Sequence, residues 1–177
     1  MKNLLKGAVL AVGLFAATNA VQAQQKIGHI NSEEVFQLTP EFKTAQDQLK
    51  TLGETKQKEL QGMYETFQKK QTEANDKLRN RSEANKEQID AEVNALGQEL
   101  QQMQTRIQEV QKVAEEEFGK KQQELMAPIQ TKVMNAINAV AKEKGYAYVL
   151  DLAAGSVVYF QGGEDISTDV KAKLGIK

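Results

Sequence analysis

The spacing of apolar residues along the chain predicts two long helices separated by a polar turn. Apolar residues recur in steps of three and four from Leu38 to Leu78, and the same spacing returns from Ile89 to Phe118. Steps of this kind place one apolar seam along a helix, as in a coiled coil. Each series also contains one interval of eleven residues, 49–60 and 107–118, which locally unwinds a supercoil.

The two unwinding intervals lie side by side if the chain folds back near residues 82–84. In that register residues whose numbers add up to 167 face each other, and eight apolar pairs result: Leu38 with Ile129, Phe42 with Leu125, Leu49 with Phe118, Leu60 with Ile107, Tyr64 with Met103, Phe67 with Leu100, Ala74 with Val93, and Leu78 with Ile89. We therefore predict an antiparallel helical hairpin over residues 40–144, with its tip near 79–87 and arms about 65 Å long. A single continuous helix is the alternative, and the interruption of the seam at the tip counts against it.

Glycine and proline inside the predicted arms leave two interpretations open. Gly53, Gly62, Gly97 and Gly119 each lower helix stability by about 1 kcal/mol relative to alanine, and Pro128 is expected to kink the returning helix near its base. These residues either occupy a solvated face without consequence or allow the hairpin to bend.

Short β-type segments flank the hairpin. Residues 26–30 predict a strand with Ile27 turned inward, a short helix follows over 32–38, and Thr39 with Pro40 suits the start of the next helix. Further along, 146–152 and 157–161 predict a β-hairpin, and a last helix ends near Leu174. Three strands are too few for a stable independent sheet, so we expect them to pack against other copies of the chain. The fold class is α+β and mainly α, with a small β body built from 24–39 and 145–177.

The first 23 residues predict an export signal. Lys2 and Lys6 precede an apolar stretch over 8–17, and Val21-Gln22-Ala23 suits cleavage after Ala23. A membrane anchor is the alternative, but ten apolar residues are short of the roughly 20 needed to span a bilayer. The mature chain, 24–177, is therefore expected to be exported.

Composition excludes several kinds of chemistry. The chain has no cysteine and a single histidine, His29, so thiolate metal sites and disulfides are absent and a histidine-based site is disfavoured. Its 23 basic and 24 acidic residues disfavour a nucleic-acid partner. The glycines at 155, 162 and 163 lack the pattern of a phosphate-binding loop, and the acidic run 115–117 suits a solvated helix. We expect no enzymatic activity, no cofactor and no metal.

Several segments resemble the Skp (OmpH-like) family of periplasmic chaperones. They are Lys-Ile-Gly-His-Ile-Asn at 26–31, Ser-Glu-Glu-Val-Phe-Gln at 32–37, and above all Val149-Leu150-Asp151 followed by 157–159 and 165–170. The resemblance covers nearly the whole mature chain. It implies a jellyfish-shaped homotrimer, in which strands of three subunits form the body and three arms enclose a cavity. That cavity would hold unfolded outer-membrane proteins without ATP and prevent their aggregation in transit.

On this hypothesis, three sets of residues are candidates for contact with a client, with a membrane surface or with other subunits. Apolar residues outside the seam are candidate client contacts, with packing against a neighbouring arm or the body as the alternative: Met63, Val113, Met126 and Met134. Basic residues at the arm tip are candidates for weak contact with a membrane surface or client, with a plain solvated turn as the alternative: Lys69, Lys70, Lys77, Arg79, Arg81 and Lys86. The residues expected in the trimer body are Ile27, Ile30, Tyr148, Leu150, Leu152, Val158 and Phe160. A coiled-coil structural or adaptor protein of an envelope complex is the alternative function.

Overall fold

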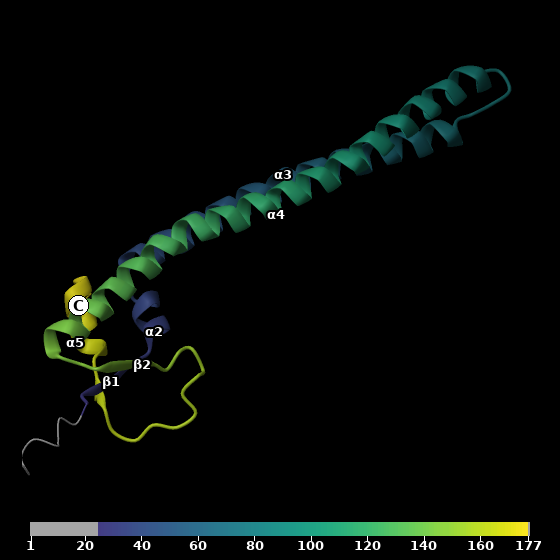
Figure 1. Ribbon diagram of the computed structural model, residues 1–177. Helices are drawn as coiled ribbons and strands as arrows, with labels where there is room; N and C mark the ends of the chain where they lie inside the picture. Colours follow the sequence, from purple (N-terminus) through teal and green to yellow (C-terminus); the bar gives the residue numbers. More distant parts are fainter. Residues whose placement is uncertain (1–24, 177) are drawn as a thin grey trace, which may run out of the picture. The chain divides into compact units, whose positions relative to one another are not determined.

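The computed structural model describes residues 25–176, which form a helical arm and a small body (Figure 1). The predicted signal segment lies outside this range. The elements in chain order are β1 (Ile27–Ile30), α2 (Ser32–Gln37), α3 (Pro40–Arg79), α4 (Lys86–Lys144), β2 (Tyr148–Asp151), β3 (Glu164–Asp165) and α5 (Ser167–Leu174). Residues 36–132 make up the arm, and residues 25–35 together with 133–176 make up the body. The prediction of a mainly helical chain with a small β part is confirmed.

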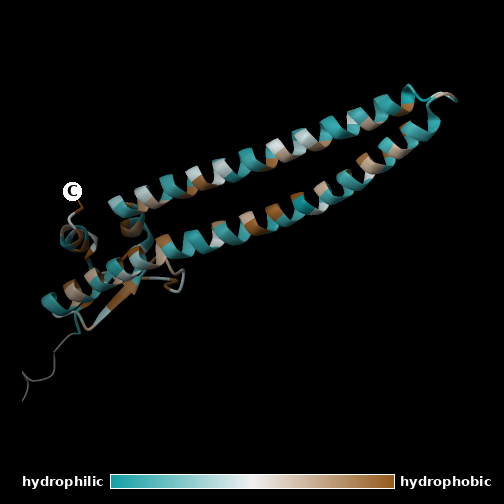
Figure 2. Ribbon diagram, turned by 90° about the horizontal axis from the view of Figure 1, so that it is seen from above, coloured by the Kyte–Doolittle hydropathy of each residue, from teal (hydrophilic) through white to brown (hydrophobic). Residues whose placement is uncertain are grey.

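The arm is an antiparallel pair of long helices. α3 and α4 run side by side along it, and both are largely hydrophilic with scattered apolar positions (Figure 2). The turn between them, residues 80–85, is closed by Asn85, whose Oδ1 accepts hydrogen bonds from the backbone N–H of Ser82 at 2.7 Å and from its hydroxyl at 3.0 Å. Asn85 Nδ2 also donates to the carbonyl of Asn80. α4 continues through Pro128.

The start of α3 follows the sequence closely. The Thr39 hydroxyl accepts a hydrogen bond from the N–H of Phe42 at 3.3 Å and donates one to the carbonyl of Phe36 at 2.7 Å. Pro40 takes the first helical position, where its missing N–H costs nothing. Leu38, predicted to open the seam, instead lies in the turn before α3 and is 49% exposed. The seam therefore begins at Phe42.

The seam between α3 and α4 is thinly packed. Within its 40 residues α3 buries only Ala45 and Leu49. Phe118 was predicted to face Leu49, but its ring lies 3.8 Å from where a side chain on Gly53 would begin, one turn nearer the tip. Glycine leaves room for an aromatic ring that a larger side chain would displace. The ring of Phe118 therefore lies beside Gly53, one turn from its predicted partner Leu49.

The body contains a three-stranded sheet with β1 in the centre. Both neighbours are parallel to it: Ile27 is paired with Tyr148 in β2, and His29 with Leu150 in β2 and with Asp165 in β3. One face of β1 is covered, because Gly28 and Ile30 are buried. The core on this side is apolar and consists of Ile30, Val35, Val133, Ala136, Ile137, Val140, Ile166 and Val170.

Two predictions for the body are wrong. Residues 157–161 form no strand, so the predicted β-hairpin is absent, and β2 pairs with β1 instead. The apolar run has strand-like composition, but it pairs with no strand of the sheet, and Val158 and Tyr159 are 97% and 77% exposed. Ile27 does not point inward and is 44% exposed. Successive residues of a strand point to opposite faces, and the covered face of β1 carries Gly28 and Ile30.

Gly28 is the glycine that the body packing requires. A Cβ there would lie 3.0 Å from Cε1 of Tyr146 and 3.2 Å from Cγ2 of Ile166. We expect Gly28→Ala to lower the free energy of unfolding by about 1–3 kcal/mol through overpacking. The matched control is Gly62→Ala on α3, where no atom lies within 4 Å and the helix should gain about 1 kcal/mol. Urea denaturation measures both; equal stability of the two variants would contradict this account of Gly28.

Candidate functional site

Exposed apolar side chains lie on one face of the body sheet and on the loop 152–163, which contacts that face through Phe160. Together they are called here the body patch: Ile27, Tyr148, Leu150, Val158, Tyr159 and Phe160. Ile27 and Tyr148 are register partners on β1 and β2, and they are 44% and 57% exposed. Leu150 lies two residues further along β2, on the same face, and is 36% exposed. The patch is therefore continuous across the two strands.

Such a patch is unusual for this kind of sheet. Parallel sheets are normally covered on both faces, whereas antiparallel sheets often leave one face to water. Here all pairing is parallel, and one face is covered only in part, by Phe160 over His29. The sheet is also small, since β3 has only two residues. Both features favour a partner surface that covers the body patch.

The loop from 152 to 163 supplies the remainder of the patch. Phe160 lies over His29 of β1, with ring centroids 5.0 Å apart, and is itself 46% exposed. Gly162 and Gly163 have φ values of +86° and +85°, which glycine adopts without strain, and they return the chain to β3. His29 is thus a strand residue, as expected. Its Nδ1 is buried and has no hydrogen-bond partner among residues 25–176.

Other residues predicted for the trimer body lie elsewhere. Ile30 is 1% exposed and belongs to the core of its own subunit. Leu152 is half-buried, and its N–H donates to the carbonyl of Ile30 at 2.8 Å. The body patch therefore leaves out Ile30 and Leu152, which were among the residues predicted for the trimer body. It includes Tyr159, which was not among them.

Asp151, at the end of β2, holds the start of α2. Its carboxylate accepts hydrogen bonds from the N–H of Ser32 at 3.1 Å, from the Ser32 hydroxyl at 2.5 Å and from the N–H of Ala153 at 3.0 Å. Burial raises the pKa of Asp151, but these hydrogen bonds outweigh burial and lower it overall. Asn31 completes the cap by accepting from the N–H of Glu34 at 3.1 Å. The link fixes β2, and with it the patch, to the N-terminal segment.

The basic residues at the arm tip are largely neutralised by acidic partners. Arg81 donates two hydrogen bonds to Asp90, at 2.7 and 2.8 Å, and Lys77 lies 2.7 Å from Glu92. The other pairs are Lys70 with Glu99, Arg79 with Asp76, and Lys86 with Glu83. Lys69 is the one residue of the predicted set with no such partner among the described residues. Across 69–99 there are six basic and seven acidic residues, so the tip is not a positive surface.

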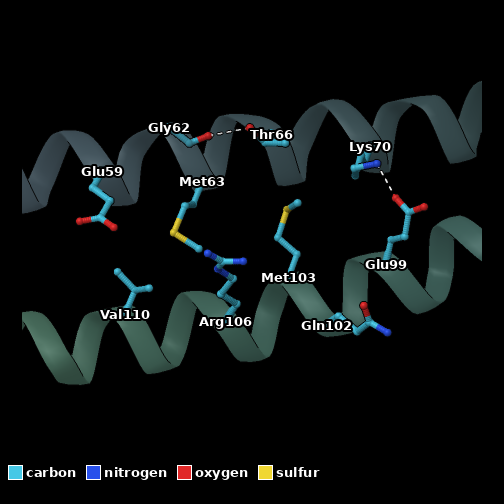
Figure 3. Close-up of a pocket in the computed structure, with 10 residues that line it drawn as sticks. All are labelled: Glu59, Gly62, Met63, Thr66, Lys70, Glu99, Gln102, Met103, Arg106 and Val110. Carbon is cyan, nitrogen blue, oxygen red and sulfur yellow. Dashed lines mark hydrogen bonds and ion pairs between the residues drawn. The ribbon is translucent and has the colours of Figure 1, made fainter.

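The four candidate client contacts fall into two groups. Val113 and Met134 are 48% and 50% exposed, whereas Met63 and Met126 are half-buried. Met63 lines a groove of about 580 Å³ between the two arm helices, opposite Met103 and Arg106 (Figure 3). It was predicted to lie outside the seam, and the structure places it within the seam. Val113 and Met134 remain the more accessible candidates.

Similar sequences and a similar solved structure identify the family of this chain. The sequence matches the family described as "Outer membrane protein (OmpH-like)" over residues 26–174. The chain belongs to the OmpH-like family. Its relatives include the chaperone protein Skp of Pectobacterium atrosepticum, 29% identical over 96% of this chain and 97% of that protein, and outer membrane protein 26 of Haemophilus influenzae, 33% identical over 96% and 93%. An OmpH-like protein from Caulobacter crescentus has the same fold, with a TM-score of 0.68 at 19% identity over 86% and 85% of the two chains.

Membership in the OmpH-like family bears out the resemblance drawn from the sequence. The family is one of chaperones and not of enzymes, which agrees with the expected lack of catalysis. Within residues 25–176 no group of histidine, aspartate and glutamate side chains is suited to hold a metal ion. In that same range, no helix has the length and apolar character needed to cross a membrane.

Three features of this OmpH-like chain were not found from the sequence. One is the set of acids on α4, at 90, 92 and 99, that pair with the basic tip; counting charges on both sides of the predicted turn would have found them. Another is the bond between Asp151 and Ser32, which are 119 positions apart. The third is Tyr159, whose exposure depends on a loop where a strand was predicted.

Proposed function

We propose that this OmpH-like protein is a periplasmic chaperone that assembles as a homotrimer and holds unfolded outer-membrane proteins between its arms without ATP. The observation that carries the proposal is the largely exposed apolar face of a parallel sheet. Further copies of the chain would cover this face. The predicted export signal and the names of the relatives, chaperone protein Skp and outer membrane protein 26, support the location and the class of client.

The clients suit a surface of many weak contacts. An unfolded barrel protein exposes alternating apolar side chains and unpaired strand edges, which aggregate in water. The arm presents half-exposed apolar residues such as Val113 among predominantly polar ones, and Met134 is a half-exposed residue of the body. Methionine adapts its shape to varied partners. Contacts of this kind delay aggregation without selecting one sequence.

The arm tip adds little attraction to an anionic membrane surface. Five of its six basic side chains already have acidic partners. The holding activity is therefore assigned to the apolar surfaces of the arms and not to the tip.

The test of the proposed function is suppression of aggregation. A urea-unfolded outer-membrane barrel protein is diluted into buffer with residues 24–177 and without nucleotide, and turbidity is followed. The proposal expects the barrel protein to stay soluble. Unchanged turbidity, together with stoichiometric copurification with a transporter complex, would favour the adaptor alternative.

Val113 allows a sharper test of the arm surface. We expect Val113→Asn to weaken client binding about fivefold, because roughly 1 kcal/mol of apolar burial is lost on binding. Lys112→Asn is the matched control, since Lys112 is a neighbouring exposed residue of α4. Both variants should retain the native mass. Fluorescence anisotropy of a labelled barrel protein measures the affinities, and equal affinity of the two variants would remove Val113 from the client surface.

A further inference from the structure

The distal arm, defined here as residues 67–100, is held together differently from the base of the arm. Leu96 is its one buried apolar side chain, whereas Ala45, Leu49 and Ile129 are buried near the base. Leu78, close to the turn, is 48% exposed. The apolar side chains of the distal arm are otherwise half-buried, among them Phe67, Ile89 and Val93, and they contribute less to closing it than the fully buried side chains do at the base.

Cross-helix ion pairs occur nearer the base, between Lys56 and Glu117 and between Lys132 and Glu41, but buried apolar side chains accompany them at the base. In the distal arm three such pairs accompany a single buried apolar side chain. Lys70 lies 2.5 Å from Glu99, Lys77 lies 2.7 Å from Glu92, and Arg81 forms a two-point contact with Asp90. In all three pairs the base comes from α3 or the turn and the acid comes from α4. Figure 3 shows the first of these pairs bridging the two helices.

Neighbouring charged and polar groups also interact with the members of these three ion pairs, so that the strength of each pair depends on its surroundings. Lys77 also approaches Glu73 at 3.8 Å, Gln88 donates to Glu92 at 2.9 Å, and Lys86, paired with Glu83, also attracts Asp90. If the acids of α4 lose their charge, Lys70, Lys77 and Arg81 remain together with Lys69 and Arg79. The charges that attract α4 to these cations are then gone, and half-buried apolar side chains together with Leu96 are left to hold the two helices together.

We propose that the distal arm is an electrostatic clasp, which opens when salt screens its three cross-helix ion pairs or acid neutralises them, while the base stays closed. The pairs are partly exposed, with side-chain exposures of 30–52% for Lys70 and Glu99 and 30–36% for Lys77 and Glu92. Screening acts over about 10 Å at 0.1 M salt and about 3 Å at 1 M, so concentrated salt reaches them.

Acid acts in the same direction. The hydrogen bond from Arg81 lowers the pKa of Asp90, and the hydrogen bond from Lys77 lowers that of Glu92. A carboxylate whose pKa is lowered in the closed form stabilises that form when the pH is above the ordinary pKa of the carboxyl group. This stabilisation is lost as the pH falls through the lowered pKa. The clasp is therefore closed near neutral pH and opens in acid below the ordinary carboxyl range.

Opening changes the surface of the arm. Ile89 and Val93, half-buried between the helices, and Leu96 become exposed when α3 and α4 separate. The apolar area near the arm tip thus varies with ionic strength. This inference concerns the arm alone and does not depend on the identity of any client.

Hydrogen exchange measured by mass spectrometry tests the clasp on residues 24–177, at one pH, in 0.05 M and in 1 M sodium chloride. Backbone amides in 70–79 and 86–100 should exchange at least about threefold faster in 1 M salt. Amides in 40–50 and 125–140 should change little. Equal acceleration of both regions, or none in either, would overturn the proposal.

Variants separate the ion pairs from a general effect of salt. The double variant Glu92→Gln with Glu99→Gln should exchange in 0.05 M salt as the native chain does in 1 M. Glu109→Gln, which removes an unpaired acid from the same helix, should leave exchange unchanged. Exchanging the charges through Lys77→Glu with Glu92→Lys should retain most of the protection. Loss of protection in that swapped variant equal to the loss in the double variant would also overturn the clasp.

Discussion

Replacing Tyr148 and Leu150 together with glutamate should convert the assembled protein into monomers. Both side chains lie on the exposed face of β2 within the body patch. Each replacement removes about 1.5–3 kcal/mol of apolar burial from the interface and adds a charge that has to be desolvated without a partner. The concentration at which the assembly dissociates should rise more than about a hundredfold. Analytical ultracentrifugation at micromolar concentration measures the change.

A second glutamate variant is the control for a general effect of added negative charge on assembly. Val113→Glu places the same side chain at a comparably exposed apolar position on the arm. It should keep the mass of the native assembly. If the Tyr148 and Leu150 variant keeps that mass as well, the body patch is not the assembly surface. Circular dichroism shows whether the monomers retain the two long helices.

Removing the Asp151 carboxylate should produce the largest loss of stability within the body. Asp151→Ala leaves the N–H and the hydroxyl of Ser32 without their acceptor, and the N–H of Ala153 also loses its bond. Hydrogen bonds to a charged acceptor typically contribute about 1.5–3 kcal/mol, so we expect a loss of about 2–3 kcal/mol. Urea denaturation at fixed protein concentration measures it. Ser32→Ala, which removes one of the three donors, should cost less.

The same substitution should change the pH dependence of stability. Because the pKa of Asp151 is lowered in the folded state, its contribution is present above the ordinary aspartate pKa of 3.8 and is lost as the pH falls through the lowered pKa. The difference between the native chain and Asp151→Ala should therefore be full near pH 7 and shrink below about pH 4. A difference that stays constant across this range would show that the carboxylate charge is not the cause.

Features set by neighbouring residues were predictable from the sequence. Thr39 and Pro40 mark the start of α3 because a cap and a first-turn proline act within four residues of each other. The turn near residues 80–85 followed from the interruption of the apolar spacing. Periodicity likewise located the long helices, since a seam needs only the sequence of one helix to be recognised.

Features set by distant residues were not predictable in the same way. Residues 157–161 have strand-like composition, but their structure depends on distant residues: β2, the predicted partner, pairs with β1, and Phe160 packs on His29 of β1. The position of Phe118 depends on the space left by Gly53, 65 positions earlier, and not on its own seam. The charge at the arm tip depends on acids that return with α4. In each case the deciding residue lies on another element.

Light scattering on residues 24–177, alone and mixed with a urea-diluted outer-membrane barrel protein, tests the central claim most directly. The account predicts the mass of three chains for the protein alone, and a soluble complex containing those three chains with the barrel protein. A monomer at micromolar concentration, or aggregation of the barrel protein to the same extent as in buffer, would contradict it.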